Sequence, residues 1–186
     1  MRKALVILLL VMALPCGRSF ASSETSSANN YQQANGLLAS KRYQEAIPLF
    51  KSTLANPLQK VPVSDVYTRI GHSYYGLGLY QNAIEAYQAA LSGQDREAQP
   101  GTRYWIGFCY FLLGQDEQAT REFLLIPELY PTAGMWVGTA YYWAGRSCER
   151  RGLKNKAAEY YKKAGGKGKS TQGRFAIKKA EEVKRR

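Results

Sequence analysis

The sequence predicts an all-α fold: a right-handed solenoid of about four helix pairs, closed by a C-terminal capping helix. Three observations indicate this fold. A pattern of small and aromatic residues recurs four times, with starting points 37, 36 and 38 residues apart. Such a period, slightly above 34 residues, is typical of stacked two-helix units. Apolar residues within each unit follow helical spacing, and glycines fall between the helices. Each unit opens on a small residue and later carries an aromatic residue: Ala34 and Phe50, Gly71 and Tyr87, Gly107 and Phe123, and Gly145 and Tyr161.

The second unit shows the pattern most completely. Its second helix is predicted from one apolar stripe at helical spacing, which begins at Tyr80 and ends at Leu91. Gly76 and Gly78 lie at the join to the preceding helix, where a positive φ angle costs little only for glycine. Gly71 is expected to face Ala83, at a close approach of the two helix backbones. One helix pair cannot bury such a stripe alone, but stacked pairs can.

The same reasoning gives the element boundaries. Residues 22–29 are polar and are predicted to be a disordered lead-in. A basic capping helix is expected at 167–186, where Phe175, Ala176, Ala180 and Val183 follow one side. The four units of the solenoid are predicted at about 30–60, 64–97, 100–132 and 138–166.

These motifs resemble the tetratricopeptide repeat family. The second unit reads Tyr67-x-x-Ile70-Gly71-x-x-Tyr74-x-x-x-Gly78-x-Tyr80-x-x-Ala83-Ile84-x-x-Tyr87-x-x-Ala90-Leu91. The third unit repeats Ile106-Gly107 and closes at Pro131. The resemblance covers roughly 155 residues and implies a scaffold that binds proteins. The stretch from Tyr104-Trp105-Ile106-Gly107 to Tyr130-Pro131 is also similar to periplasmic members that accompany the Tol–Pal system and outer-membrane assembly.

The N-terminus is predicted to be a signal peptide covering residues 1–21. Two basic residues follow Met1, an apolar run extends from Ala4 to Leu14, and Ser19-Phe20-Ala21 fits the small-x-small cleavage rule. Cleavage near Ala21 predicts a periplasmic or secreted protein. Two alternatives stay open: lipid attachment at Cys16, and an uncleaved anchor.

Positive charge is concentrated at the C-terminus. The whole chain carries a net charge of +12, and residues 146–186 contain 15 Lys and Arg against 4 Asp and Glu, which gives +11. The lysines are explained either by a polar helix that only caps the stack or by a cap that also contacts an anionic surface. An acidic protein, membrane headgroups and an anionic wall polymer are the candidate surfaces. Nucleic acid is not expected as a partner of an exported protein.

Catalytic and metal-binding patterns are scarce, so we expect no enzyme, no cofactor and no metal site. His72 is the one histidine and lacks a nucleophile or ligand at a suitable spacing. Residues 165–170 imitate the end of a phosphate loop but follow a helix instead of a strand. Cys109 and Cys148 are interpreted as small buried residues, and a disulfide between them is the alternative.

The family resemblance implies that the first helix of each pair lines a concave groove. Residues at spacings of three and four place one stripe on these helices. Phe108 and Phe111 beside Tyr104 exceed what one helix interface needs, which favours binding over core packing alone. The predicted partner-binding residues are Tyr31, Asn35, His72, Tyr75, Tyr104, Phe108, Phe111, Tyr142, Arg146 and Arg150.

These observations together predict an exported protein–protein interaction module or scaffold that serves cell-envelope assembly or maintenance. One alternative is a membrane-associated component, including a lipoprotein, of a secretion or outer-membrane assembly complex. A further alternative is an accessory protein of a cell-wall enzyme.

Overall fold

The structure is a computed structural model that describes residues 18–92, 99–166 and 171–185. Helices joined by short turns make up these ranges, with no strand among them, so the predicted all-α class is confirmed. The helices are α1 (Arg18–Ala39), α2 (Tyr43–Ala55), α3 (Val63–Gly76), α4 (Tyr80–Leu91), α5 (Gln99–Leu112), α6 (Asp116–Leu129), α7 (Gly134–Arg150), α8 (Lys154–Gly165) and α9 (Thr171–Arg185).

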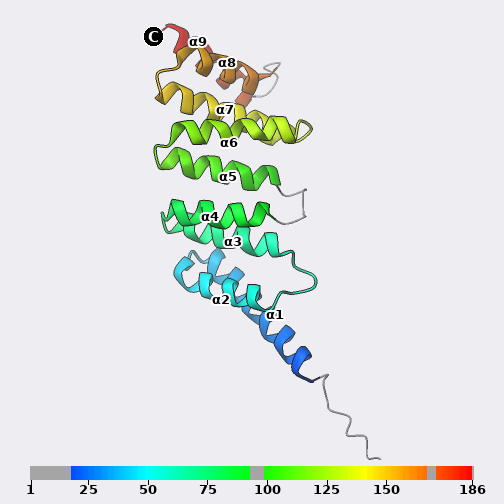
Figure 1. Ribbon diagram of the computed structural model, residues 1–186. Coiled ribbons are helices and arrows are strands. Elements are labelled where there is room, and N and C mark those ends of the chain that lie inside the picture. The colour runs from blue at the N-terminus through cyan, green and yellow to red at the C-terminus, as the bar shows by residue number, and fades with distance from the viewer. Residues whose placement is uncertain (1–17, 93–98, 167–170, 186) are drawn as a thin grey trace, which may run out of the picture.

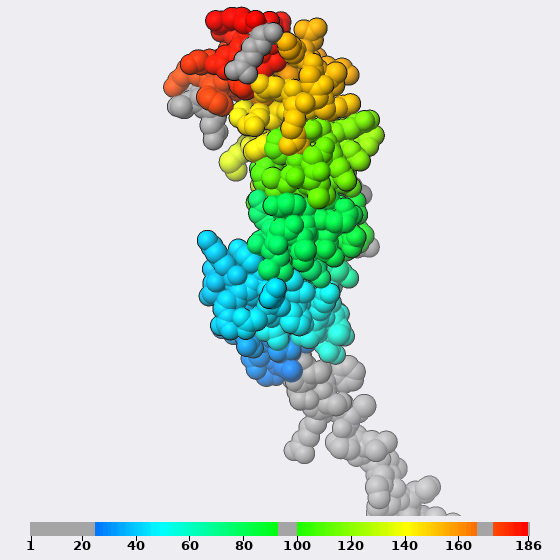
Figure 2. All heavy atoms as spheres, turned by 90° about the vertical axis from the view of Figure 1, so that its left-hand side faces the viewer, coloured from blue at the N-terminus to red at the C-terminus, as the bar shows by residue number. Residues whose placement is uncertain are grey.

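The helices stack in chain order into an elongated column (Figure 1). Each helix packs mainly against its predecessor and its successor, and α5 also contacts α7. The space-filling view shows the same order of segments along the column (Figure 2). Contacts limited to neighbouring units are the defining property of a solenoid.

A small residue of each first helix makes room for a ring of the second helix. A Cβ atom added at Gly71 would lie 2.4 Å from the ring of Tyr87, and one at Gly145 would lie 2.9 Å from the ring of Tyr161. Gly107 has the same relation to Phe123. The predicted partner of Gly71 was Ala83, but the atoms nearest to its missing side chain belong to Tyr87. The small residue therefore accommodates a ring.

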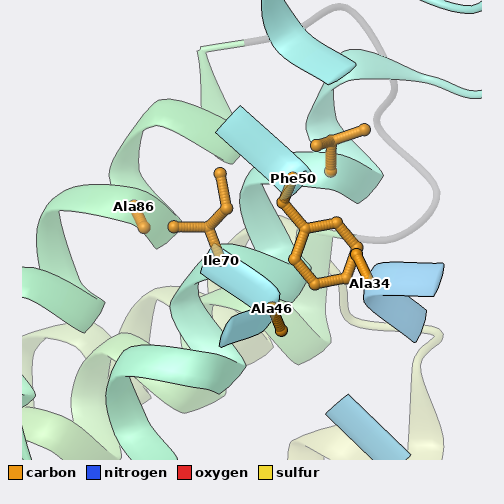
Figure 3. Close-up of a cluster of buried hydrophobic side chains, with 6 residues drawn as sticks. Ala34, Ala46, Phe50, Ile70 and Ala86 are labelled. Carbon is orange, nitrogen blue, oxygen red and sulfur yellow. The ribbon is translucent and has the colours of Figure 1, made fainter. Parts of the chain in front are cut away.

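The first helix pair uses alanine at this position. Ala34 of α1 and Phe50 of α2 are both fully buried. Figure 3 shows them in one cluster with Ala46, with Ile70 of α3 and with Ala86 of α4. The core of the first pair is thus continuous with that of the second, which is how a stack buries a stripe that one pair leaves open.

The turns within the pairs follow the predicted glycine pattern. Gly78, Gly114 and Gly152 all have positive φ angles, between 74° and 78°. The corresponding turn of the first pair places Lys41 at a φ of 59°, a conformation that costs a residue with a side chain more than glycine. The first unit therefore departs from the pattern in its turn as well as in its small residue.

Two boundaries differ from the prediction. Residues 22–29, predicted to be a disordered lead-in, belong to α1. Ser27 is buried, and the helix continues directly into Asn30, whose Nδ2 donates a hydrogen bond of 3.0 Å to Ser52 Oγ of α2. Helix α7 begins at Gly134, one turn before the predicted start of the fourth unit, and its added turn carries Trp136, which contacts Tyr104.

The predicted signal peptide falls largely on residues 1–17, which lie outside the described residues, and its cleavage site falls within α1. None of the described helices has the length and apolar character needed to cross a membrane.

Helix α9 covers the end of the last pair. Ala176, Ala180 and Val183 are buried, and the last two belong to a cluster that includes Tyr161 of α8. Lys179 Nζ lies 3.1 Å from Glu149 Oε1 of α7, which ties the cap to the first helix of that pair.

Candidate binding face

The predicted binding residues lie on the first helices α1, α3, α5 and α7, whose exposed sides we call the first-helix face. Nine of the ten residues are half-buried, and Arg150 is exposed. Side chains of this kind have two uses at once: they pack against neighbours and still present atoms to a partner. The structure divides them into an aromatic centre, a polar network near the N-terminal end and an arginine pair near the C-terminal end.

The aromatic centre is continuous over three helices. Phe108 lies between two nearly parallel rings, with centroid distances of 5.8 Å to Tyr104 and 6.3 Å to Phe111. Its ring also meets Trp143 of α7 edge-on at 4.7 Å, and it lies 6.2 Å from Tyr75 of α3 and 6.1 Å from Trp105. We define the aromatic face as the half-buried rings Tyr75, Tyr104, Trp105, Phe108, Phe111, Trp136, Tyr142 and Trp143.

Three tryptophans of this face are absent from the predicted binding residues. Trp105 and Trp143 directly follow the predicted residues Tyr104 and Tyr142, so they fell outside a stripe defined by spacings of three and four. Their position between adjacent first helices brings them to the surface: Trp105 contacts Tyr75 at 5.0 Å. The available signal was the repeated aromatic dipeptide.

A hollow of about 400 Å³ adjoins the aromatic face. Residues of the second, third and fourth pairs line it, among them Thr68, His72, Trp105 and Trp136. His72 Nδ1 shares a hydrogen bond of 2.7 Å with Tyr87 Oη. Burial, and secondarily the charge of Arg69, lowers the pKa of His72. The ring is therefore neutral near pH 7, as expected for a structural histidine at the edge of a groove.

The predicted residues of α1 take part in a polar network between the first and second pairs. Tyr31 Oη donates to Asp65 Oδ2 at 2.5 Å, and Arg69 Nε donates to the same oxygen at 2.8 Å. Arg69 also donates to Asn35 Oδ1 at 2.7 Å. Burial, together with the hydrogen bond to Asp65, raises the pKa of Tyr31. Tyr31 and Asn35 thus hold two helix pairs together.

The two predicted arginines of α7 have different environments. Arg150 forms a bidentate contact with Asp116 of α6, and its guanidinium lies 3.9 Å from the ring centre of Phe111. Arg146 lies over the ring of Trp143 at 5.8 Å, and a hydrogen bond with Tyr142 raises its pKa. No described carboxylate lies within ion-pair distance of Arg146.

A second hollow, which we call the α7–α9 hollow, has a volume of about 710 Å³ and is lined mainly by apolar side chains and glycines. Met135 of α7 is 78% exposed and Phe175 of α9 is 56% exposed, and both line it. Tyr142 lies between the hollow and the aromatic face and contacts Phe175 at 6.3 Å. The hollow therefore extends the aromatic face towards the capping helix.

The described residues contain no cluster of His, Cys, Asp and Glu suited to hold a metal ion. Cys109 and Cys148 are free and buried, so the disulfide considered for them is not formed. Burial raises the pKa of Cys109 to about 12, which makes it a poor nucleophile at neutral pH.

Comparisons with known proteins agree with this architecture. Sequence models of the tetratricopeptide repeat match residues 31–101 and 68–133, and another matches residues 138–164. No curated protein sequence matches the chain significantly.

Among solved structures, MamA from AMB-1 is 17% identical, with a TM-score of 0.63, over 88% of this chain and 85% of its own. A tetratricopeptide repeat protein from Parabacteroides merdae is 18% identical, with a TM-score of 0.70, over 86% of this chain and 60% of its own. The Sgt2 tetratricopeptide domain from Aspergillus fumigatus is 23% identical, with a TM-score of 0.56, over 67% of this chain and 81% of its own. At these identities the likeness concerns the fold.

Proposed function

The chain belongs to the tetratricopeptide repeat family, whose domains bind protein partners, and we propose that it is an exported interaction module that captures a partner protein on its aromatic face. Members of this family are generally scaffolds without catalytic activity. The observation that carries the proposal is the continuous row of half-buried rings from α3 to α7. Within this row the single ring of Phe108 contacts Tyr104, Phe111 and Trp143. Large exposed aromatic surfaces are unusual on monomers and often mark interaction sites.

The partner surface should complement this arrangement. Apolar side chains are expected against Tyr104, Phe108 and Phe111, because aromatic residues at a desolvated centre provide most of the affinity of an interface. An acidic group is expected near Arg146, because no described carboxylate lies within ion-pair distance of it and Glu149 acts on it only at longer range. Arg150 is a weaker candidate for this contact than the sequence indicated, because Asp116 already occupies its guanidinium.

The basic C-terminal end provides a second contact in this proposal. Lys154, Lys156 and Lys162 of α8 and Lys178 and Lys184 of α9 are exposed and have no ion-pair partner among the described residues. The buried side of α9 explains why the helix is present but does not explain these lysines. We therefore assign α9 two roles: it caps the stack and contacts an anionic surface of the envelope.

Export and a role in envelope assembly or maintenance are part of the proposal and depend on the N-terminal sequence. The alternative is a membrane-associated component of a secretion or outer-membrane assembly complex, favoured by Cys16 and the basic end. Intact-mass measurement of the exported protein tests this point. We expect an N-terminus at Ser22 without an acyl chain, and a diacylated Cys16 at the terminus would instead establish the lipid-anchored alternative.

Capture of the partner tests the binding face. The protein, immobilised and incubated with an envelope extract, should retain one or a few proteins that mass spectrometry identifies. Phe111→Ala removes a ring from the face and should abolish their retention. Tyr160→Ala is the matched control, because this half-buried ring stacks on Tyr141 in a contact that involves none of the aromatic-face residues. Equal retention by a folded Phe111→Ala protein would contradict the proposal.

A further inference from the structure

We propose that the α7–α9 hollow is the part of the binding surface that selects the partner, and that it takes an acidic protein segment carrying bulky apolar side chains. The inference depends on the proposed function, because it names the kind of partner. It concerns a different set of residues from the aromatic centre, however, and the two can fail separately.

The size and lining of the hollow fit a peptide segment. Its volume of about 710 Å³ falls in the range of roughly 300–1,000 Å³ that is common for ligand-binding pockets. Tyr142, Trp143 and Ala176 supply an apolar lining, and the exposed side chains of Met135 and Phe175 flank it. Two large apolar side chains that are more than half exposed at one opening indicate a surface that a partner covers.

The glycines of this hollow differ from those of the core. Gly71, Gly107 and Gly145 are required by the fold, because a Cβ atom on any of them would collide with a ring. A Cβ atom on Gly138 would lie 3.7 Å from the Ala164 carbonyl oxygen, and one on Gly134 would meet nothing within 4 Å. Glycine destabilises a helix relative to alanine, and here no contact within the described chain requires it. The glycines leave space that no described residue fills.

Charge decides the kind of segment. Arg146 contacts Tyr142 and Trp143, both of which line the hollow, yet no described carboxylate pairs with it. Lys178, one turn beyond Phe175 on α9, is exposed and also lacks an ion pair. Glu149 is the acidic residue of α7 closest in sequence to Arg146, and it already accepts bonds from Lys179 and Tyr161. Glu149 also acts on Arg146 through longer-range electrostatics. Arg146 and Lys178 together carry more positive charge than this one carboxylate balances, and this excess favours acidic side chains on the partner.

Four short synthetic peptides of equal length provide the probe. One combines Asp and Glu with Phe and Leu, the second replaces Phe and Leu by Ser, the third replaces Asp and Glu by Lys, and the fourth replaces them by Gln. Fluorescence anisotropy with the full chain should show that the first binds at least about tenfold more tightly than the others, because it combines anchors with complementary charge. Equal affinity for all four, or no binding by any, would overturn the proposal.

A substitution that fills the hollow locates the binding. Gly138→Leu should weaken binding of the first peptide by about tenfold or more while the protein stays folded, because the new side chain occupies the space of an anchor. Gly36→Leu is the matched control: Gly36 is an exposed helical glycine of α1 with nothing within 4 Å, and its substitution should leave affinity unchanged. Unchanged affinity in folded Gly138→Leu would exclude the hollow as the site.

Met135 provides an independent observation. Methyl resonances of ¹³C-labelled methionine are few in this chain, which has 3 methionines, and Met135→Leu identifies the one that belongs to the hollow. Its resonance should shift when the first peptide binds, and a resonance that stays unmoved at saturation would contradict the proposal. Met135→Glu changes an exposed side chain, so it should fold normally and repel the acidic peptide even if Gly138→Leu did not fold.

If these tests exclude the hollow while Phe111→Ala still abolishes partner capture, the aromatic face keeps its proposed function without this subsite. The reverse result, with peptide binding in the hollow and normal capture by Phe111→Ala, would contradict the proposed centre of the face alone.

Discussion

Arg150 Nε of α7 donates hydrogen bonds to both carboxylate oxygens of Asp116 of α6, to Oδ1 at 2.8 Å and to Oδ2 at 2.7 Å. The same guanidinium donates to the Phe111 carbonyl oxygen at 2.5 Å and covers the Phe111 ring. One side chain thereby joins the fourth helix pair to both helices of the third. A residue that the sequence assigned to partner binding therefore has a structural role within the stack.

The first prediction follows from this contact. Arg150→Ala should lower the free energy of unfolding by about 1–2 kcal/mol, because a bidentate pair with the largely buried Asp116 is lost. Arg151→Ala is the neighbouring control, since Arg151 reaches only the exposed Glu117 at 3.6 Å, and it should change stability by less than about 0.5 kcal/mol. Urea denaturation compares the two variants, and equal values would show that the Arg150 contact adds nothing to the stack.

A second prediction concerns the glycine–ring contact. Gly71→Ala should cost about 1–3 kcal/mol of stability, because the new Cβ atom would lie 2.4 Å from the Tyr87 ring. Gly36→Ala should instead stabilise the protein by about 0.5–1 kcal/mol, because alanine favours a helix and meets no neighbour there. Thermal unfolding of the two variants should shift in opposite directions. A neutral Gly71→Ala would show that the pair of helices has room to separate.

The third prediction uses the one histidine of the chain. Burial, and then the charge of Arg69, lowers the pKa of His72, while Asp65 acts in the opposite direction; Tyr87 and Trp105 are its other neighbours. Below the unfolded pKa of about 6.5, the unfolded chain binds a proton that the folded chain resists, so stability should fall as the pH drops from about 7.5 to about 5.5.

His72→Gln should flatten this pH dependence, which urea denaturation across the same range measures. A dependence of equal slope in His72→Gln would assign it to other groups.

The fourth prediction separates the capping role of α9 from the anionic contact of the exposed lysines of α8 and α9. Val183→Ala should cost about 1–3 kcal/mol, because Val183 is buried against the last pair. Joint replacement of the exposed Lys156 and Lys178 by Gln should leave stability within about 0.5 kcal/mol of the original protein.

The same double variant should bind anionic lipid vesicles more weakly, by about 1 kcal/mol per lysine removed. Vesicles of zwitterionic lipid are the control, and binding should fall with rising salt. If the unaltered chain does not bind anionic vesicles, membrane headgroups are excluded as the anionic surface. Towards a membrane, α9 then acts as a cap only.

The repeat could be predicted because its spacing reflects a single packing relation. A small residue and a ring sixteen positions later, such as Gly71 and Tyr87, are the two sides of one helix contact. The polar stretch at 22–29 could not be assigned correctly from its composition, because it continues the helix whose following part contacts α2 through the bond from Asn30 to Ser52. Local composition contains no record of that neighbour.

The candidate site was predicted less completely, for a related reason. A helical stripe identifies the first-helix face. Contacts between helix pairs, however, determine which of its side chains are already engaged within the stack and which remain available to a partner. Three of these contacts join residues 34 positions apart: Tyr31 with Asp65, Asn35 with Arg69, and Asp116 with Arg150. Complementary residues one repeat apart are thus a signal in the sequence, and it would have marked Tyr31, Asn35 and Arg150 as structural.

Site-specific photocrosslinking tests the central claim most directly, because it reports which face the partner touches in the native envelope. A photoreactive amino acid would replace Thr68 or Leu112 on the first-helix face, and Gln81 or Gln88 on the exposed side of α4. The account predicts a crosslinked partner from Thr68 and Leu112 and none from Gln81 or Gln88. Crosslinks from the α4 positions alone would contradict binding on the aromatic face.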